Sequence, residues 1–333
     1  MRKRNICLFG GTGFVGKHLA NELYERGHRI KIFTRRADQH RELLVIPSVR
    51  LIEMDLDDEA KLEQELRGTD IVINLLGTLD ARQPDAQRKL HVDIPVRIAK
   101  LAQRVGVVQM LHMSVAGAAP DAPSQFLRTK AEGERRLREQ TGDALPVTIF
   151  RPTTIFGPGD HFVSRFIQLL RRVPLVFPLP RPESKFAPVY VGDVVLAMAL
   201  SIDNHRALGQ SFCLSGPRQY SLRQIVKLAA EASGHQRWTM GLPDNLSRLQ
   251  ARILQRLPGA VYTLDNDLTT SVPSICPENH LQTFFNLNPL ALETVLPFYA
   301  GNSVTRGRFD EYRRLAGRED LLANTGARPF RPH

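Results

Sequence analysis

Along the first half of the chain, short runs of apolar residues alternate with longer segments in which apolar residues recur every three or four positions. The short runs have the composition of strands buried in a parallel sheet, and the longer segments have the period of helices packed against one. The pattern predicts strands at residues 6–9, 28–34, 49–54, 70–75, 107–113 and 146–150. Strands separated by helices of this length indicate a parallel sheet covered by helices on both faces.

Three of the intervening helices are predicted at residues 14–26, 88–105 and 124–140. Pro95 interrupts the second helix, because proline cannot donate the backbone hydrogen bond. Ser124 stands where it can cap the third. We therefore expect an α/β fold built on a doubly wound parallel sheet of the Rossmann type, with a smaller, mostly helical C-terminal domain.

The regular alternation stops at the Pro- and Gly-rich loop 151–160. The later segments are a basic helix at 165–172, a proline-rich stretch at 173–182, short strands at 187–193 and 210–214, and helices at 194–202, 221–234 and 292–299. We predict that residues 1–160, joined by 187–215, form the sheet domain. Residues 161–186 and 216–317 are predicted to form a smaller substrate or partner domain, and 318–333 a loosely held tail.

The first strand runs into three glycines at three-residue spacing, Gly10, Gly13 and Gly16, and a helix follows at once. Such a strand, tight turn and helix bind a pyrophosphate: the first glycine turns the chain, the second admits the phosphates and the third lets the helix approach the strand. The helix N-terminus adds a positive field. We predict a nicotinamide dinucleotide site here that also includes Thr12, Phe14 and Val15, which makes the sheet domain an NAD(P)-binding domain.

The second predicted strand ends in Arg35 and Arg36, and residues 33–36 hold no Asp or Glu. A carboxylate at this point binds the ribose 2′-hydroxyl of NAD, whereas arginine accommodates the 2′-phosphate of NADP. The sequence favours NADP(H) over NAD(H). The alternative is that both arginines simply face water.

Further cofactor contacts are expected where the third and fourth strands end. Asp55 and Leu56 follow the third strand, and the Asp55 carboxylate is placed either near the adenine amino group or as the cap of the next helix. Leu76 and Gly77 follow the fourth strand, where a small residue lets the cofactor pass.

The formal net charge of +11 over 333 residues suits an anionic partner such as a phosphorylated cofactor, an acidic lipid surface or nucleic acid. Nucleic acid is disfavoured, because no basic strand with interleaved aromatics and no recognition helix is found. A basic stretch at 165–185 with leucines and prolines is a candidate for the mouth of a substrate site or for a peripheral membrane contact. A solvated basic surface is the simpler alternative.

Cys7, Cys213 and Cys276 lie far apart without C-x-x-C spacing, so we expect buried thiols in a reducing compartment. The ten histidines show no metal-ligand spacing, and no metal is predicted. Neither a signal-peptide pattern nor an apolar run long enough to span a membrane is found. We expect a cytoplasmic protein that can attach peripherally to the inner face of the membrane.

Taken in order, these motifs resemble the extended and atypical short-chain dehydrogenase/reductases, which include the NAD-dependent epimerases and dehydratases. The matching elements lie in about the first 215 residues and are the 10–16 loop, Asp55, Ser114, Lys130, 151–159 and 188–193. The narrower resemblance, carried by 92–95, 106–107, 129–134 and 214–217, is to the NAD(P)H-binding 39-kDa accessory subunit family of respiratory complex I and its bacterial relatives. It implies that Pro152, Thr153 and Lys130 also contact the cofactor.

In active members of this superfamily, a tyrosine four residues before the lysine exchanges a proton with the substrate, and the lysine binds the nicotinamide ribose. The corresponding residue here is Phe126, which has no ionisable proton and cannot supply general acid–base catalysis, worth about 10²–10⁴-fold. Lys130 and Ser114 remain as candidate catalytic residues, Ser114 to orient a carbonyl.

Three functions follow. The first is an NADP(H)-binding structural or regulatory protein linked to a respiratory or quinone-related complex. The second is an active NADPH-dependent reductase or epimerase that uses Lys130 or Tyr190 in place of the missing acid. The third is a dinucleotide-binding regulator that reports redox state to a partner.

Overall fold

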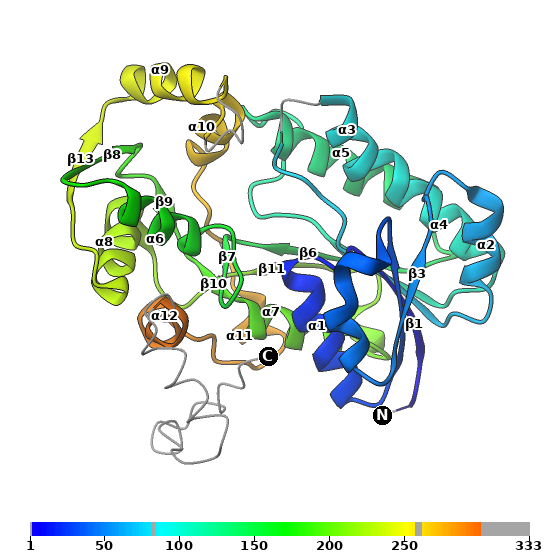
Figure 1. Cartoon of the computed structure of the whole chain (residues 1–333). Coiled ribbons are helices and arrows are strands. Elements are labelled where there is room, and N and C mark those ends of the chain that lie inside the picture. The colour runs from blue at the N-terminus through cyan, green and yellow to red at the C-terminus, as the bar shows by residue number, and fades with distance from the viewer. Residues whose placement is uncertain (1, 81–83, 257–261, 301–333) are drawn as a thin grey trace, which may run out of the picture.

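The computed structural model describes residues 2–80, 84–256 and 262–300. Its centre is a seven-stranded parallel sheet with the strand order β11-β6-β5-β4-β1-β2-β3 (Figure 1). The strands are β1 Asn5–Phe9, β2 Arg29–Thr34, β3 Val49–Glu53, β4 Ile71–Asn74, β5 Gln109–Met113, β6 Val147–Pro152 and β11 Ser211–Leu214. All six predicted N-terminal strands are therefore present in a parallel sheet.

Helices cover both faces of this sheet, as the alternating pattern predicts. On one face, α1 (Phe14–Glu25), α7 (Val191–Leu200) and α11 (His280–Thr283) pack on the sheet through one apolar cluster. On the other face, α2 (Glu59–Leu66), α4 (Ile94–Arg104) and α5 (Gln125–Thr141) pack through a second cluster. The doubly wound Rossmann class is confirmed.

The strand order reverses between β1 and β4, which lie side by side although they are far apart in the sequence. Loops that follow the two strands leave the sheet in opposite directions there, and this opens a crevice at the carboxyl ends. The glycine loop after β1 and the Leu76–Gly77 segment after β4 therefore lie at the same edge.

The smaller lobe has its own apolar core, formed chiefly by α6 (Val163–Arg172), α8 (Leu222–Ser233) and α12 (Leu292–Ala300). Short strands complete it: β8 (Val176–Pro180) pairs with β13 (Trp238–Leu242), and β9 (Lys185–Phe186) with β12 (Tyr220–Ser221). Helix α9 (Asp244–Leu254) lies at its outer end, and α10 (Leu264–Thr270) lies between α9 and α5 (Figure 1). At the junction, β7 (Ile155–Phe156) pairs with β10 (Val189–Tyr190).

Several local expectations are corrected. The proline-rich stretch contains β8, because Phe177 and Leu179 alternate into the core while the prolines fill half-buried positions. The 88–105 helix is α3 (Pro84–Arg88), a π-helical turn (Lys89–Asp93) and α4, so Pro95 lies in the first turn of α4. Short 3₁₀ segments lie at Ala37–Val45 and His205–Ala207. The predicted tail lies outside the described residues.

The expectation of three thiols is wrong for two of the cysteines. Cys213 on β11 and Cys276 form a disulfide across 63 residues, and Cys7 is a free, buried thiol. Sequence spacing could not show this pairing, because the chain enters and leaves the smaller lobe before the two side chains meet. The bond joins the segment that follows α10 to the edge strand of the main sheet.

Candidate functional site

The loop between β1 and α1 has the geometry that a pyrophosphate requires. Gly10 has φ +77°, and a Cβ there would lie 2.9 Å from the backbone of Leu75 at the end of β4. A Cβ on Gly16 would lie 2.4 Å from the Gly10 carbonyl oxygen. Gly13 is the N-cap of α1 and has no side chain to cap the first helical turn, so the N–H groups of that turn are open to an anion.

The other predicted residues of this loop have different roles. Phe14 and Val15 pack against the sheet core, and Phe14 makes an edge contact with His18. The His18 ring is within 3.0 Å of the Pro158 carbonyl oxygen, which ties α1 to the 151–160 loop. Thr12 is half-buried within the turn. The predicted loop therefore combines backbone donors with a rigid apolar support.

Arg35 and Arg36 lie exposed directly after β2. Among the described residues, neither forms an ion pair. The nearest carboxylate along the neighbouring strand, Glu53 at the end of β3, accepts a hydrogen bond from the Ala37 N–H at 2.8 Å. Both guanidinium groups are thus available at the point where an adenosine ribose would lie.

Asp55 does not cap the helix that follows it. Its carboxylate accepts a hydrogen bond from the Asp57 N–H at 3.0 Å, and Asp58 is the N-cap of α2, accepting from Lys61 N–H. The capping alternative for Asp55 is therefore wrong, and the adenine alternative stays a prediction. Leu56 is partly buried against the α2 and α4 face of the sheet.

Lys130 lies at the carboxyl ends of β4 and β5. Its Nζ donates to the carbonyl oxygens of Leu76 at 3.3 Å and Met113 at 3.2 Å. A Cβ on Gly77 would lie 3.0 Å from the same nitrogen, so glycine leaves the space in front of the ammonium open. Burial lowers the pKa of Lys130 to about 8.

Ser114 follows β5 directly, and its hydroxyl is buried without a hydrogen-bond partner among the described residues. Pro152 is the last residue of β6, the strand beside β5, and Thr153 follows it. The Thr153 hydroxyl is buried and donates to the Ala187 carbonyl oxygen at 2.6 Å, so its side chain is already engaged. A buried hydroxyl without an acceptor, one residue from a carbonyl that Lys130 contacts, is placed to bind a ligand.

His91, which the sequence analysis missed, links Phe126 to this site. The Thr78 N–H donates to His91 Nε2 at 3.0 Å, so the ring proton is on Nδ1, which donates to the Thr129 hydroxyl at 2.8 Å. That hydroxyl donates to the Phe126 carbonyl oxygen at 3.1 Å. Burial and nearby Lys130 lower the pKa of His91 to about 2. Both ring nitrogens are engaged, and the ring stays neutral.

Two further contacts were missed because they join distant segments. Asp265 on α10 accepts hydrogen bonds from the N–H groups of Gln125 at 2.6 Å and Phe126 at 3.2 Å. The smaller lobe thus caps the N-terminus of α5. On the sheet, Asn74 donates to His112 Nδ1 at 3.0 Å, which leaves the His112 Nε2 proton buried without an acceptor in the described part of the chain.

These observations fit a nicotinamide dinucleotide. The glycine loop would hold the pyrophosphate, and Lys130 and Ser114 would face the nicotinamide half across the β1–β4 crevice. Lys130, which donates to two carbonyl oxygens, would keep its third N–H for a ribose hydroxyl. Bound there, the dinucleotide would supply hydride chemistry.

We expect dinucleotide affinity to decrease as the pH rises through about 8, because Lys130 loses its proton there in the free protein. An ammonium beside an anionic ligand is favoured over the neutral amine, so binding should be tightest below this pH and coupled to proton uptake above it. Titration calorimetry in buffers of different ionisation enthalpy measures both effects. Lys130→Met should flatten the pH profile, and exposed Lys100→Met should leave it unchanged. A wild-type profile that is flat across this range would contradict the assignment.

The chain belongs to the NAD dependent epimerase/dehydratase family, whose pattern matches residues 6–214. This membership supports binding of a nicotinamide dinucleotide. The chain is 32% identical over 228 residues to the mitochondrial NADH dehydrogenase (ubiquinone) 1 alpha subcomplex subunit 9 of Rattus norvegicus. The match covers 66% of this chain and 59% of the rat protein, so the chain spans about three fifths of that relative's length.

A bacterial relative, the ceramide reductase of Caulobacter vibrioides, is 29% identical over 244 residues, covering 72% of this chain and 74% of the reductase. Among solved structures, the UDP-glucose 4-epimerase of Thermotoga maritima with UDP-glucose superposes with a TM-score of 0.70 at 20% identity, covering 94% of this chain and 99% of the epimerase. The epimerase/dehydratase fold and the relationship to complex I accessory subunits and bacterial reductases are confirmed. Among the helices described, none combines the length and apolar character needed to cross a bilayer.

Proposed function

We propose that the protein binds NADP(H) as a long-lived structural or regulatory ligand, at a site without the tyrosine acid of active short-chain dehydrogenase/reductases. The observation that carries the proposal is Phe126. It lies in the first turn of α5, one helical turn before Lys130. Its ring packs edge-on with the His91 ring, and the two ring centroids are 5.5 Å apart. Phenylalanine has no proton to exchange with a substrate.

Neighbouring groups do not replace the missing acid. The neutral His91 ring is held at both nitrogens. Tyr190 packs partly buried against Phe156 at the junction of the lobes, and this burial together with nearby Asp193 raises its pKa. A phenol with a raised pKa is a poor proton donor at neutral pH. These contacts favour a site that binds the nucleotide without transferring a proton to a substrate.

Exposed Arg35 and Arg36, unpaired with any described carboxylate, support NADP(H) over NAD(H). We expect the double variant Arg35→Asp, Arg36→Ala to lose affinity for NADPH by about 100-fold or more, because two charge-assisted contacts to the 2′-phosphate are each worth about 1.5–3 kcal/mol. Affinity for NADH should change little. Fluorescence titration of both nucleotides measures the difference, with exposed Arg67→Ala as control. Equal losses for the two nucleotides would mean that the arginines do not contact a 2′-phosphate.

The similarity to complex I subunits supports a partner in a respiratory or quinone-related assembly. We propose residues 161–186 and the later smaller lobe as the partner or substrate domain, and peripheral attachment to an anionic membrane surface on the cytoplasmic side. The net charge of +11 supports such a surface.

A second candidate function is an NADPH-dependent reductase in which Lys130 donates the proton. The lowered pKa of Lys130, about 8, and the partnerless Ser114 hydroxyl favour it, since together they could bind and protonate a carbonyl oxygen. The similarity to a ceramide reductase supports it as well. A redox-reporting regulator would use the same site without turnover.

Purification without added nucleotide, followed by denaturing release and mass spectrometry, separates these functions. Retained NADPH that stays reduced in the presence of carbonyl compounds is the expected result. Steady oxidation of NADPH by a carbonyl substrate, lost in Lys130→Met, would establish the reductase instead. Release that depends on the redox state of the nucleotide, without turnover, would establish the regulator.

A further inference from the structure

Helix α9 presents its large apolar residues to solvent. Its buried positions are Ser247 and Ala251, both fully buried, whereas Leu246 is 48%, Leu249 49% and Ile253 58% exposed. A surface helix of a globular protein normally buries its apolar stripe and exposes its polar one. The orientation of α9 is the reverse of this pattern.

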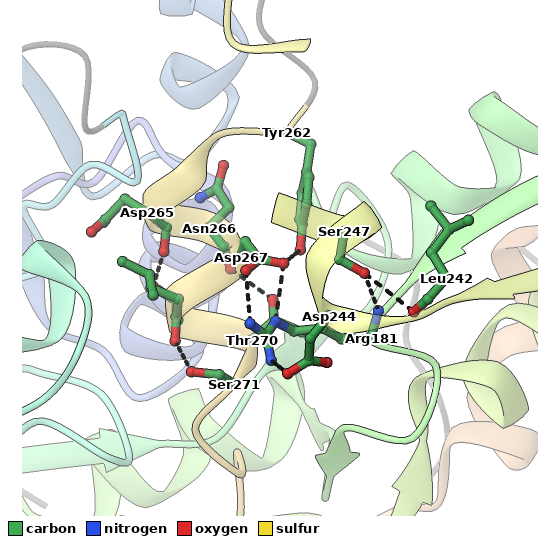
Figure 2. Close-up of polar contacts among 12 residues, drawn as sticks. Arg181, Leu242, Asp244, Ser247, Tyr262, Asp265, Asn266, Asp267, Thr270 and Ser271 are labelled. Carbon is green, nitrogen blue, oxygen red and sulfur yellow. Dashed lines mark hydrogen bonds and ion pairs between the residues drawn. The ribbon is translucent and has the colours of Figure 1, made fainter. Parts of the chain in front are cut away.

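A buried polar cluster holds α9 in this orientation (Figure 2). The Arg181 guanidinium donates to the fully buried Asp267 of α10 at 3.0 and 2.8 Å and pairs with Asp244 at 3.3 Å. The Ser247 hydroxyl accepts from the Arg181 N–H at 3.3 Å, and Tyr262 donates to Asp267 at 2.9 Å. Helix α9 joins this cluster through Ser247 and Asp244. Rotation of α9 to bury its leucines would withdraw the Ser247 hydroxyl from the Arg181 backbone N–H and the Leu242 carbonyl oxygen, and leaving such buried polar groups without partners would be costly.

The adjoining strand pair extends the apolar surface. Trp238 on β13 is 72% exposed and lies opposite Val176 of β8, and Met240 lies opposite Pro178. Side chains at paired positions of parallel strands lie on the same face, while Phe177 and Leu179 point from the other face into the core. Leu175, which precedes β8, is also exposed. We call Leu175, Val176, Trp238, Met240, Leu246, Leu249 and Ile253 the outer face.

The charges near the outer face are mostly positive. Arg248, Arg252 and Arg256 follow at four-residue spacing along the exposed side of α9 and its end. Within the described residues none of the three is paired with a carboxylate. The segments 161–182 and 232–256 together hold eight arginines and one acidic residue, Asp244, which is bound to Arg181.

We propose that the outer face docks on the interfacial region of a membrane containing anionic phospholipid. Exposed leucine, isoleucine, methionine and tryptophan would enter the headgroup boundary, and the three arginines would bind lipid phosphates. A second copy of this chain would bring arginines against arginines, so charge complementarity favours the anionic lipid surface. The proposal rests on the peripheral attachment proposed above and is independent of nucleotide binding.

The outer face takes in only part of the 165–185 stretch. The Arg181 side chain is nearly buried in its ion pair with Asp267 and serves the interior of the lobe. Arg172, by contrast, is exposed three residues before Leu175. The exposed cations closest in sequence to the outer-face residues are therefore Arg172 and the three arginines of α9 and its end.

Trp238 is the only tryptophan of the chain, so its fluorescence reports on the outer face directly. We expect vesicles of phosphatidylcholine with phosphatidylglycerol to shift its emission to shorter wavelength and to retain the full-length protein in flotation. Vesicles of phosphatidylcholine alone, or high salt, should weaken retention about tenfold. An unshifted emission with retained protein would place the contact elsewhere and overturn the proposed surface.

Matched variants separate this surface from membrane binding in general. Leu249→Ser with Ile253→Ser, and Arg248→Gln with Arg252→Gln, should each lower retention about tenfold. The controls Leu44→Ser with Val45→Ser, and Arg135→Gln with Arg136→Gln, change exposed residues of the sheet domain equally and should retain wild-type binding.

Three results would overturn the proposal in distinguishable ways. Wild-type protein that binds no vesicle would reject peripheral attachment itself. Equal binding by outer-face and control variants would reject this surface and leave peripheral attachment standing. A wild-type dimer that the outer-face variants convert to a monomer would show that a second copy covers the face. Nucleotide retention, measured on every variant, shows that the fold is intact.

Discussion

Replacing Gly13 by aspartate is expected to abolish dinucleotide binding while the fold stays intact. Gly13 is the N-cap of α1 with extended backbone angles, φ −79° and ψ 178°, which any residue adopts. A carboxylate there would accept hydrogen bonds from the open N–H groups of the first turn and would repel the pyrophosphate. Losing two charge-assisted hydrogen bonds, each worth about 1.5–3 kcal/mol, weakens binding by roughly 100-fold or more.

The stability of the same variant makes the test specific. Aspartate is a favourable N-cap, and its Cβ would approach only the Gly10 carbonyl oxygen, at 3.3 Å, so Tm should stay within a few degrees of wild type. Gly13→Asn has the same shape without the charge and should lose less affinity. Nucleotide affinity and Tm are measured together. Undiminished NADPH affinity in Gly13→Asp would show that the glycine loop does not bind the pyrophosphate.

Replacing Gly133 by alanine is expected to destabilise the protein, although alanine is normally the better helix former by about 1 kcal/mol. A Cβ on Gly133 would lie 2.1 Å from the carbonyl oxygen of His91. The helix must move away from the π-helical turn, and overpacking of this kind costs about 1–3 kcal/mol. Lys130 is one turn away on the same helix, so nucleotide affinity should decrease as well.

Thermal unfolding and nucleotide titration measure both effects. We expect Tm to decrease by several degrees. Arg135→Ala, on the exposed side of α5, removes only a surface ion pair and should change Tm little. A Gly133→Ala protein as stable as wild type would show that the helix and the π-helical turn are not in the close contact described here.

The sheet and its nucleotide loop follow from the sequence because both depend on local patterns. The central strands β1 and β4 are buried on both faces, so they are nearly unbroken apolar runs, and β2 and β3 alternate apolar with polar residues. Gly10, Gly13 and Gly16 lie within seven consecutive residues. The caps at Ser124 and Ser221 depend on side chains within three residues of the backbone that they satisfy. Such local contacts can be predicted from a short stretch of sequence.

The tertiary structure decided the contacts between residues that lie far apart in the sequence. The carbonyl oxygens that accept hydrogen bonds from Lys130 come from two other segments. The His91 ring that packs on Phe126 lies on a π-helical turn that no periodicity predicted. The disulfide joins positions 63 residues apart.

The orientation of α9 shows the same limit. Its amphipathic sequence alone would predict buried leucines. The buried Ser247 hydroxyl instead holds the other face inward, through hydrogen bonds with the Arg181 backbone N–H and the Leu242 carbonyl oxygen. The cost of leaving these buried polar groups without partners offsets the gain from burying a few exposed apolar side chains. Local pattern thus determined the nucleotide-binding framework, and long-range packing determined the surroundings of Lys130 and the face that α9 presents to solvent.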